Sequence, residues 1–358
     1  MCLLCNSIDA AKVDAFGGQL LQILNHSGLA LMISVGHRTG LFDTMATLPP
    51  ADAMTIAGAA GLNERYVREW LGAMTVGRIV RHDAAAGTYH LPAEHAALVT
   101  RAAAPNNIAA FTQYIAVLGQ VEDRIVDCFR AGGGVPYAEF KRFHEVMSED
   151  SGQSVVAALF EHILPLVPGL MERLERGIDV LDLGCGRGRA LAMMARRFPR
   201  SRFLGVDFSA EAIGWAEEQA EQDALPNLRY EVRDAATLDY SAAFDFITTF
   251  DAIHDQARPD SVLANIRRAL RADGVYLMQD IRASSSHAGD MDHPVGPLLY
   301  AVSTMHCMTV SLANGGMGLG TMWGEKVARR MLAEAGFGDI RIERLAHDFQ
   351  NDYYIIHG

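Results

Sequence analysis

The chain has 358 residues, a length that suggests two or three domains. Half of the residues are apolar, which is enough for a large core, but no apolar run reaches the roughly 20 residues of a membrane helix. A formal net charge of −12 repels phosphate backbones, so nucleic acid is an unfavourable partner. The five cysteines and the lack of an export signal at the first residues predict a cytoplasmic protein without a disulfide framework.

The first third of the chain carries helical patterns. Apolar residues recur at roughly helical spacing over residues 9–35, and a short helix is predicted over Met54–Ala60. A further helix is predicted over Glu64–Val76, for which Asn63 is a suitable N-cap. The residues of this helix that we expect to face a core are Tyr66, Val67, Trp70 and Leu71.

A hairpin pattern follows. Residues 79–82 and 88–91 are typical of two short strands around a turn at 84–87. A helix–turn–helix followed by a hairpin is the pattern of a winged helix. A DNA-reading helix normally offers net positive charge, whereas the charges on residues 64–76 nearly cancel. This favours a packing and dimerisation role, with DNA binding as the alternative.

Residues 105–168 form a predicted helical bridge that covers the open edge of the domain after it. The glycine-rich loop at 131–137 interrupts this bridge, and it is either the hinge of a mobile lid or an ordinary linker. Tyr114, Tyr137 and His144 are the substrate-binding candidates in the bridge. For Tyr137 and His144 a plain surface position is an equal alternative.

The most informative segment begins at Asp179. An apolar strand runs into three glycines at alternate positions, Gly184, Gly186 and Gly188, and a helix-like run follows. Glycines let the backbone turn tightly and let a ligand lie close against the main chain. Strand, glycine turn and helix open the nucleotide-type sites of doubly wound α/β folds. The G-x-G-x-G spacing differs, however, from the G-x-G-x-x-G of dinucleotide binders.

Four further apolar strands each end in a carboxylate, at Asp207, Asp234, Asp251 and Asp280. Because the carboxyl ends of parallel strands meet at one edge of a sheet, we expect these side chains to converge on a ligand site. Asp207 follows the glycines by about twenty residues, where such folds place an acid that grips ribose hydroxyls.

Together these segments resemble class I S-adenosylmethionine-dependent methyltransferases over residues 170–358. The resemblance implies an α/β fold, with a seven-stranded Rossmann-like sheet that is mostly parallel and has an antiparallel last strand. It also implies that Asp207 binds the ribose of the cofactor and Asp234 meets the adenine edge. The residues predicted around S-adenosylmethionine, or its product S-adenosylhomocysteine, are Asp182, Gly184, Cys185, Gly186, Gly188, Asp207, Phe208, Asp234, Ala235, Phe250 and Asp251.

The order of the domains resembles small-molecule O-methyltransferases of the plant and antibiotic-tailoring kind, and a bacterial subfamily of winged-helix methyltransferases with unassigned acceptors. In such enzymes the winged-helix domain mediates dimerisation and helps to wall the substrate pocket. We therefore expect a homodimer. Each chain would have a winged-helix domain at 1–104, a helical bridge and substrate cap at 105–168, and a cofactor-binding domain at 169–358.

His254 follows the fourth strand of the sheet and matches the general base of the plant-type enzymes by position, with Asp255 after it as the second catalytic residue. The aromatic residue usual after this pair is replaced by Gln256. A histidine with a near-neutral pKa suits the removal of a proton from an acceptor hydroxyl or thiol. A structural histidine that bonds a loop carbonyl is the alternative.

A second cluster lies between the fifth strand and the last helix, where class I enzymes commonly build the acceptor pocket. Its predicted substrate-binding residues are His293, Tyr300, His306 and Trp323, and Cys307 is a further polar point. A core helix with a buried histidine is the alternative. No metal is predicted, because the histidines and Cys307 have no recognised ligand spacing, and the Cys2–Cys5 pair has no second pair to complete a zinc site.

We therefore predict an enzyme that methylates a small molecule in the cytoplasm, on oxygen first, sulfur second and nitrogen third. The competing hypothesis is a transcriptional regulator that senses the cofactor or a metabolite through its winged helix. A protein methyltransferase is a third hypothesis, which an enclosed pocket would disfavour.

Overall fold

The computed structural model describes residues 8–358, so the Cys2–Cys5 pair lies outside the described residues. The chain divides into two compact units, Met1–Ala116 and Val117–Gly358, and each unit is described by itself. The expected division into three parts differs from this, because the predicted bridge at 105–168 contributes residues to both units. Within the described part of the chain, no helix combines the length and apolar character that a membrane crossing requires.

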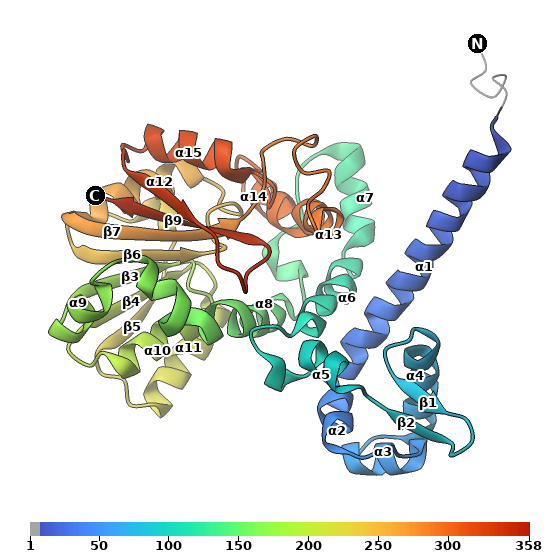
Figure 1. The fold of residues 1–358 in the computed structure, drawn as a ribbon. Helices are drawn as coiled ribbons and strands as arrows, with labels where there is room; N and C mark the ends of the chain where they lie inside the picture. Colours follow the sequence, from blue (N-terminus) through green and yellow to red (C-terminus); the bar gives the residue numbers. More distant parts are fainter. Residues whose placement is uncertain (1–7) are drawn as a thin grey trace. The chain divides into compact units, whose positions relative to one another are not determined.

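The first unit has the order of elements predicted for a winged helix, and all of its elements lie in the blue to cyan part of the chain (Figure 1). Its α-helices are α1 (Ala10–Arg38), α2 (Leu41–Thr47), α3 (Ala53–Ala60), α4 (Glu64–Val76) and α5 (Ala93–Val99). Its hairpin pairs β1 (Arg81–Asp83) with β2 (Thr88–His90) in antiparallel register. Two 3₁₀ turns follow, η2 (Arg101–Ala103) and η3 (Ile108–Thr112).

Helix α4 begins where the sequence predicts, because the Asn63 side chain accepts a hydrogen bond from the main-chain N–H of Arg65 at 3.1 Å. Its buried residues are Val67, Trp70, Leu71 and Met74, at the spacing of one helix face. The prediction for Tyr66 was wrong: its side chain is 79% exposed, because it lies about 100° around the helix from Val67.

The arginines of α4 are paired within the helix itself. Arg68 donates two hydrogen bonds to the Glu64 carboxylate, at 2.8 and 2.6 Å, and Arg65 pairs with Glu69 one turn further on. The predicted near-cancellation of charge is therefore a set of local ion pairs. A helix that reads DNA needs arginines free to meet phosphates and bases.

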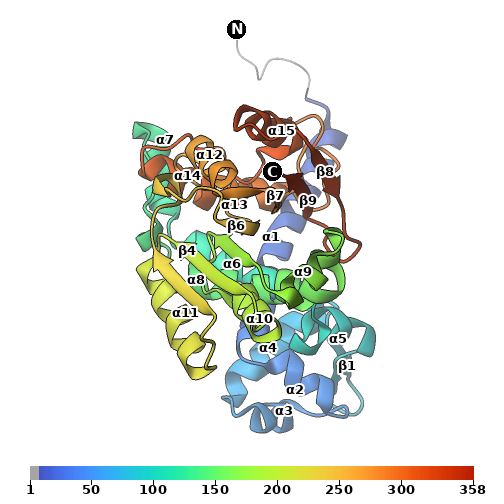
Figure 2. The ribbon, with the colours of Figure 1, turned by 90° about the vertical axis from the view of Figure 1, so that its left-hand side faces the viewer.

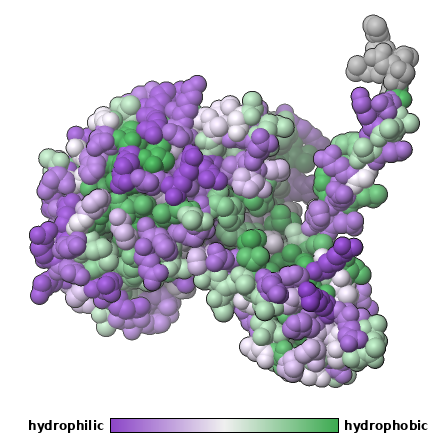
Figure 3. All heavy atoms as spheres, in the orientation of Figure 1, coloured by the Kyte–Doolittle hydropathy of each residue, from purple (hydrophilic) through white to green (hydrophobic). Residues whose placement is uncertain are grey.

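Helix α1 leaves most of its length exposed within this unit. The three buried residues that it contributes, Ser34, Gly36 and His37, all lie in its last turns. Large apolar side chains that are 40–69% exposed recur at spacings of three, four and seven residues, at Val13, Phe16, Leu20, Leu24, Leu31 and Val35. Figure 3 shows these hydrophobic patches among polar ones along the helix.

The second unit is built on the predicted seven-stranded sheet, in the order β5-β4-β3-β6-β7-β9-β8. The strands are β3 (Asp179–Leu183), β4 (Arg202–Asp207), β5 (Leu228–Val232), β6 (Phe244–Phe250), β7 (Leu270–Ile281), β8 (Ile340–Glu343) and β9 (Asn351–His357). All neighbours are parallel except β9, which runs antiparallel to both β7 and β8. Chain order reverses between β3 and β6, the switch point at which such sheets bind ligands.

Helices cover both faces of this sheet (Figures 1 and 2). Helices α9 (Leu170–Arg176), α10 (Arg189–Arg197) and α11 (Ala210–Gln222) pack on one face through a core that includes Leu174, Leu191 and Ile213. Helices α12 (Pro259–Ala269) and α15 (Gly324–Glu334) pack on the other face through a core that includes Leu263 and Leu332.

The remaining helical segments lie before β3, after β5 and after β7 in the chain. Before β3 they are α6 (Gln113–Gly119, which crosses the unit boundary), α7 (Glu122–Ala131), η4 (Tyr137–Glu139), α8 (Phe143–Ser151), the π-helical η5 (Gly152–Val156) and η6 (Leu159–Ile163), and η7 (Leu164–Leu166). After β5 comes η8 (Ala235–Thr237), and after β7 come α13 (Gly296–Val302), the π-helical η9 (Ser303–Cys307) and α14 (Met308–Ala313).

Candidate functional site

The glycine turn after β3 has the left-handed backbone that its sequence requires. Gly186 has a φ of 53°, and a Cβ added there would meet nothing within 4 Å, so its main chain faces open space. Gly184 has a φ of 69°, and its Cβ would lie 2.4 Å from the Cβ of Ala252. Gly186 therefore leaves its main chain open to a ligand, and Gly184 permits close packing against the loop after β6.

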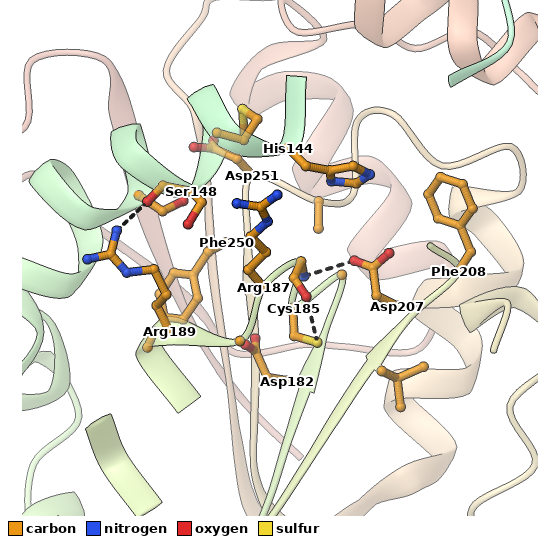
Figure 4. A pocket seen from close by; sticks show the side chains of 18 of the residues that line it. His144, Ser148, Asp182, Cys185, Arg187, Arg189, Asp207, Phe208, Phe250 and Asp251 are labelled. Carbon is orange, nitrogen blue, oxygen red and sulfur yellow. Dashed lines mark hydrogen bonds between the residues drawn. The ribbon is translucent and has the colours of Figure 1, made fainter. Parts of the chain in front are cut away.

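Asp207, the last residue of β4, is tied to this turn. One of its carboxylate oxygens accepts the main-chain N–H of Gly186 at 2.9 Å, as Figure 4 shows, and the other accepts that of Ser209 at 2.9 Å. Burial raises the pKa of Asp207 above its usual value, although the hydrogen bonds to the carboxylate oppose this shift. The carboxylate is thus fixed beside the glycine turn.

A cavity opens at this edge of the sheet, in front of the glycine turn. Most residues predicted around a cofactor line it, namely Asp182, Gly184, Cys185, Gly186, Gly188, Asp207, Phe208, Ala235, Phe250 and Asp251. Asp234 does not line it: its side chain is exposed and accepts the main-chain N–H of Ala236 at 2.8 Å. Arg233 and Ala235, on either side of Asp234, line the cavity in its place.

Two buried groups form the floor of the cavity. Asp182 accepts a hydrogen bond from the Thr248 hydroxyl at 2.8 Å, and burial raises the pKa of Asp182 to about 7. Burial also raises the pKa of the Cys185 thiol well above its ordinary value. Cys185 is therefore an inert packing group at neutral pH.

Sequence reasoning missed the cavity wall contributed by α8 and α10. Arg189 reaches across the cavity wall and donates a hydrogen bond to the main-chain oxygen of Ser148 at 2.7 Å (Figure 4). Arg187 pairs with Glu211 at 2.8 Å. Met147 and Ser148 line the same space from α8. A single sequence carries no signal for contacts between segments some 40 residues apart.

His254 lies just beyond β6, as the sequence predicts, but its carboxylate partner is Asp280. The His254 Nδ1 atom lies 2.7 Å from the Oδ1 atom of Asp280, at the end of β7. The Trp323 indole N–H donates to the same oxygen at 3.0 Å. Asp255, the predicted catalytic partner, instead lines the cavity and accepts a long bond of 3.4 Å from Gln256.

His254 is 4% exposed and is not among the residues that line the cavity, although residues on both sides of it are. Burial by itself would lower the pKa of His254, but the Asp280 carboxylate and the Cys307 side chain more than reverse this. The result is a pKa well above the ordinary value. Asp280 thus holds the His254 ring through Nδ1.

An aromatic cluster lies beside the cavity. His306, on the π-helical η9, stacks on Phe143 with ring centroids 3.4 Å apart and contacts Tyr137 and Phe140 edge-on. Burial and the neighbouring histidines lower the pKa of His306 well below its usual value, so its ring is neutral. His144 stacks on Tyr137 and lies 3.0 Å from the Ser209 hydroxyl. Tyr137 and His144 both line the cavity.

Other predicted substrate residues lie elsewhere. His293 lines a second, open depression together with Arg282 and Lys326. The Tyr300 hydroxyl donates to Asp290 at 3.1 Å. Tyr114 is buried and belongs to the first unit, so its assignment stays a prediction.

The glycine loop at 132–134 is anchored to α14 of the second unit. The main-chain N–H of Val135 donates to the Thr309 hydroxyl at 2.8 Å. A Cβ added to Gly134 would lie 2.0 Å from the main-chain oxygen of Thr309, so only glycine allows this approach. The end of the loop at Gly134 thus packs against α14, while Gly132 and Gly133, with φ of 75° and 82°, make the turn before it.

Two family models match this chain. Residues 27–101 match the model described as an Rv2258c-like winged HTH domain, and residues 174–336 match the model described as a methyltransferase domain. The glycine turn, β4 with Asp207, and the His254–Asp280 pair all fall inside the second match. The predictions of a winged-helix domain and of a methyltransferase domain are therefore confirmed.

Curated relatives are similar over part of their length. The chain is 38% identical over 110 residues to a trans-aconitate 2-methyltransferase of Deinococcus radiodurans. The aligned region covers 31% of this chain and 40% of that protein. It is 28% identical over 113 residues to an (S)-coclaurine N-methyltransferase of Papaver somniferum, covering 31% and 32% respectively. The chain thus spans about a third to two fifths of the length of these relatives.

Solved structures match over nearly the whole chain. Human N-acetylserotonin methyltransferase in complex with SAM gives a TM-score of 0.68 at 16% identity, covering 98% of this chain and 99% of that one. The mitomycin 7-O-methyltransferase gives 0.66 at 16% identity, covering 98% and 100%. At such identities the likeness establishes the shared fold, which confirms the predicted seven-stranded sheet with an N-terminal winged-helix domain.

Proposed function

We propose that this chain, a methyltransferase-domain protein with an N-terminal winged helix–turn–helix domain, transfers a methyl group from S-adenosylmethionine to an oxygen of a small-molecule acceptor. The observation that carries the proposal is the joining of three features at one sheet edge. These are the bare main chain at Gly186, the fixed carboxylate of Asp207, and the buried His254–Asp280 pair.

The cavity fits the cofactor that the fold family implies. Gly186 offers main chain with no side chain above it, and each oxygen of Asp207 accepts one main-chain N–H and keeps a lone pair for a ribose hydroxyl. Ala235 and Arg233 wall the cavity next to β5, where the adenine would lie. When bound, S-adenosylmethionine supplies an electrophilic methyl group.

The chain's own residues then have two tasks. The first is to align the acceptor and exclude water, for which the aromatic side chains of Tyr137, Phe143 and Phe208 are suited, because all three line the cavity. The second is to remove the acceptor's proton. Asp280 fixes the His254 ring through Nδ1, and we assign the removal of that proton to the other ring nitrogen, which has the Cys307 side chain as a neighbour.

Oxygen is the preferred acceptor atom because the site contains a histidine whose ring a carboxylate orients. An alcohol or phenol must lose a proton near the moment of attack, whereas a thiol ionises near neutral pH and needs less help. Sulfur stays the second choice and nitrogen the third. Asp255, at the cavity wall, is proposed to hold the acceptor rather than to orient His254.

We also propose that the enzyme is a homodimer that forms through α1. A 29-residue helix with a stripe of exposed apolar side chains is unstable as a solvated surface, and a second copy of the same stripe covers it. Apolar residues at three-, four- and seven-residue spacing lie on one face of a helix, as helix-to-helix packing requires.

The regulator hypothesis keeps one supporting observation, the match of residues 27–101 to a winged HTH domain. The ion pairs within α4 argue against it, because Arg65 and Arg68 are already neutralised by glutamates. Salt-sensitive retardation of specific genomic fragments in a gel would favour the regulator.

The deciding experiment measures binding and transfer separately. Calorimetry with S-adenosylhomocysteine should give one site per chain, and a panel of phenols, carboxylic acids and thiols should be screened for transfer of labelled methyl groups. Wild-type protein that binds neither S-adenosylmethionine nor its product would overturn the proposal. Binding without transfer to any class of acceptor, together with specific DNA retention, would replace it by the regulator.

A further inference from the structure

Three ligand-type side chains meet at the carboxyl edge of β6 and β7. Asp251, His254 and Asp280 each offer one ligand atom, and these atoms all lie within 4.8 Å of one another. Asp251 directly follows β6, His254 lies three residues further on, and Asp280 lies on β7. The tight parallel pairing of β6 and β7 brings the three together, since Phe250 is in register with Gln279.

Two oxygens of this cluster are buried without a partner. In the described part of the chain, Asp251 Oδ1 and Asp280 Oδ2 have no hydrogen-bond partner, although the Asp280 residue is 1% exposed. The other oxygen of each carboxylate is occupied. Asp280 Oδ1 accepts from the Ile281 main chain and the Trp323 indole, and Asp251 Oδ2 accepts from Gln279 at 3.3 Å. An orphaned buried carboxylate oxygen is costly unless a ligand meets it.

The charge of this cluster is compensated only in part, because its two carboxylates share one imidazole. Among the ion pairs of the described residues, neither aspartate has an arginine or lysine partner, and Asp280 pairs with His254 alone. Asp280 is buried and Asp251 is half-buried, and His254 alone does not neutralise two carboxylates this close to one another. Burial and the nearby Asp280 accordingly raise the pKa of Asp251 well above its usual value. A cation bound between the orphaned oxygens would satisfy both oxygens and both charges.

We propose that Asp251, His254 and Asp280 form a binding site for a divalent transition-metal ion. One imidazole and two carboxylates are a ligand set that suits Mn²⁺ and Zn²⁺, because imidazole favours zinc and carboxylates favour manganese. Asp251 also lines the cavity, which gives the ion a route to the site (Figure 4).

Ion binding at this site would regulate the proposed methyl transfer. A neutral imidazole has one free lone pair, so a His254 ring nitrogen that binds the ion leaves the ring unable to accept a proton. The metal-bound chain therefore lacks the base, and ion binding and base catalysis exclude one another at His254. The ion would act as an inhibitor that competes with the proton.

The test measures metal binding directly, without any acceptor. Wild-type protein is dialysed against a chelator and titrated with Mn²⁺, followed by electron paramagnetic resonance, and with Zn²⁺, followed by calorimetry. We expect one site per chain, with the affinity for the ion lowered at least about tenfold in Asp251→Asn and in Asp280→Asn. Asp255→Asn is the matched control, a half-buried carboxylate of the same loop, like Asp251, that should leave the affinity for the ion unchanged.

Thermal unfolding of each variant shows whether the fold is intact. If Asp280→Asn does not fold, Asp251→Asn carries the test, since Asp251 bonds one side chain and no strand partner through its carboxylate. Binding of neither ion below millimolar concentration by the wild type would overturn the proposal. So would equal affinity of the wild type and Asp251→Asn. Neither result bears on S-adenosylhomocysteine binding, so the proposed methyl transfer would stand.

Discussion

Asp280 accepts a hydrogen bond of 2.7 Å from His254 Nδ1, although the two residues are 26 positions apart in the sequence. Both residues are almost fully buried. A carboxylate held this close fixes the ring and makes the opposite nitrogen more basic. We infer that Asp280 is a positioning residue for the proposed base.

The first prediction concerns this pair. Because the base must be unprotonated, the rate should rise with pH through the pKa of His254, which Asp280 raises. Asp280→Asn should therefore lower the maximal rate and move the midpoint of the pH–rate profile to lower pH. Profiles of kcat/KM are measured with a chelator present. A profile with an unchanged midpoint would contradict the positioning role, and Asp255→Asn serves as the comparison.

The second prediction compares Asp207 with Asp234, because the sequence predicts that both bind the cofactor. Asp207→Asn should weaken S-adenosylhomocysteine binding by about 10- to 100-fold, because hydrogen bonds between a carboxylate and ribose hydroxyls are worth about 1.5–3 kcal/mol. Asp234→Ala should have a smaller effect, because its side chain is exposed and turned to the Ala236 main chain. Calorimetry on both variants measures this, and equal losses would show that the family's adenine contact at Asp234 applies here.

The third prediction concerns the bare main chain at Gly186. Gly186→Ala adds a Cβ that points into open space and costs about 1 kcal/mol of backbone strain at a φ of 53°. Folding should survive, while S-adenosylhomocysteine binding should fall. Gly214→Ala in α11 is the control, because its Cβ also meets nothing but lies on a helix. Unchanged affinity in Gly186→Ala would mean that no ligand covers this turn.

These cases show what one sequence can and cannot supply. The bounds of α4, the cap at Asn63, the glycine turn and Asp207 were predictable because each depends on residues close in sequence. The pairing of His254 with Asp280 was not, because it depends on the register of β6 against β7. The sequence placed Asp280 at the right edge, but it offered Asp255 as the nearer partner.

The fourth prediction concerns α1. Leu20→Lys combined with Leu24→Lys puts charges in the middle of the exposed apolar stripe and should convert a dimer to a monomer in sedimentation experiments. Met54→Lys on α3 is the matched control, since Met54 is 67% exposed but lies outside the stripe. A wild-type chain that sediments as a monomer would refute the proposed dimer, and helix content measured by circular dichroism shows whether α1 persists.

The fifth prediction concerns acid stability. Burial lowers the pKa of His306 well below 6.5 in the folded chain. As the pH falls below 6.5, His306 is therefore protonated in the unfolded chain but stays neutral in the folded chain. Stability should thus fall with acidification, and His306→Phe should flatten part of this fall while keeping an aromatic ring against Phe143. Denaturant unfolding at pH 5 and pH 7.5 measures it, with His90→Phe on the exposed edge of β2 as control.

Strand β9 is inserted between β7 and β8, so the segment that supplies Asp280 has its outer neighbour drawn from residues 351–357. Asp280 is itself in register with Asp352. During synthesis, the half of the sheet that carries Asp207 is made more than a hundred residues before that neighbour emerges. The sheet therefore closes only after β9 is made, because Tyr353 and Ile355 of β9 also belong to the core that α10 and α11 cover. A chain that ends before β9 should therefore lose both the outer neighbour of Asp280 and part of that core.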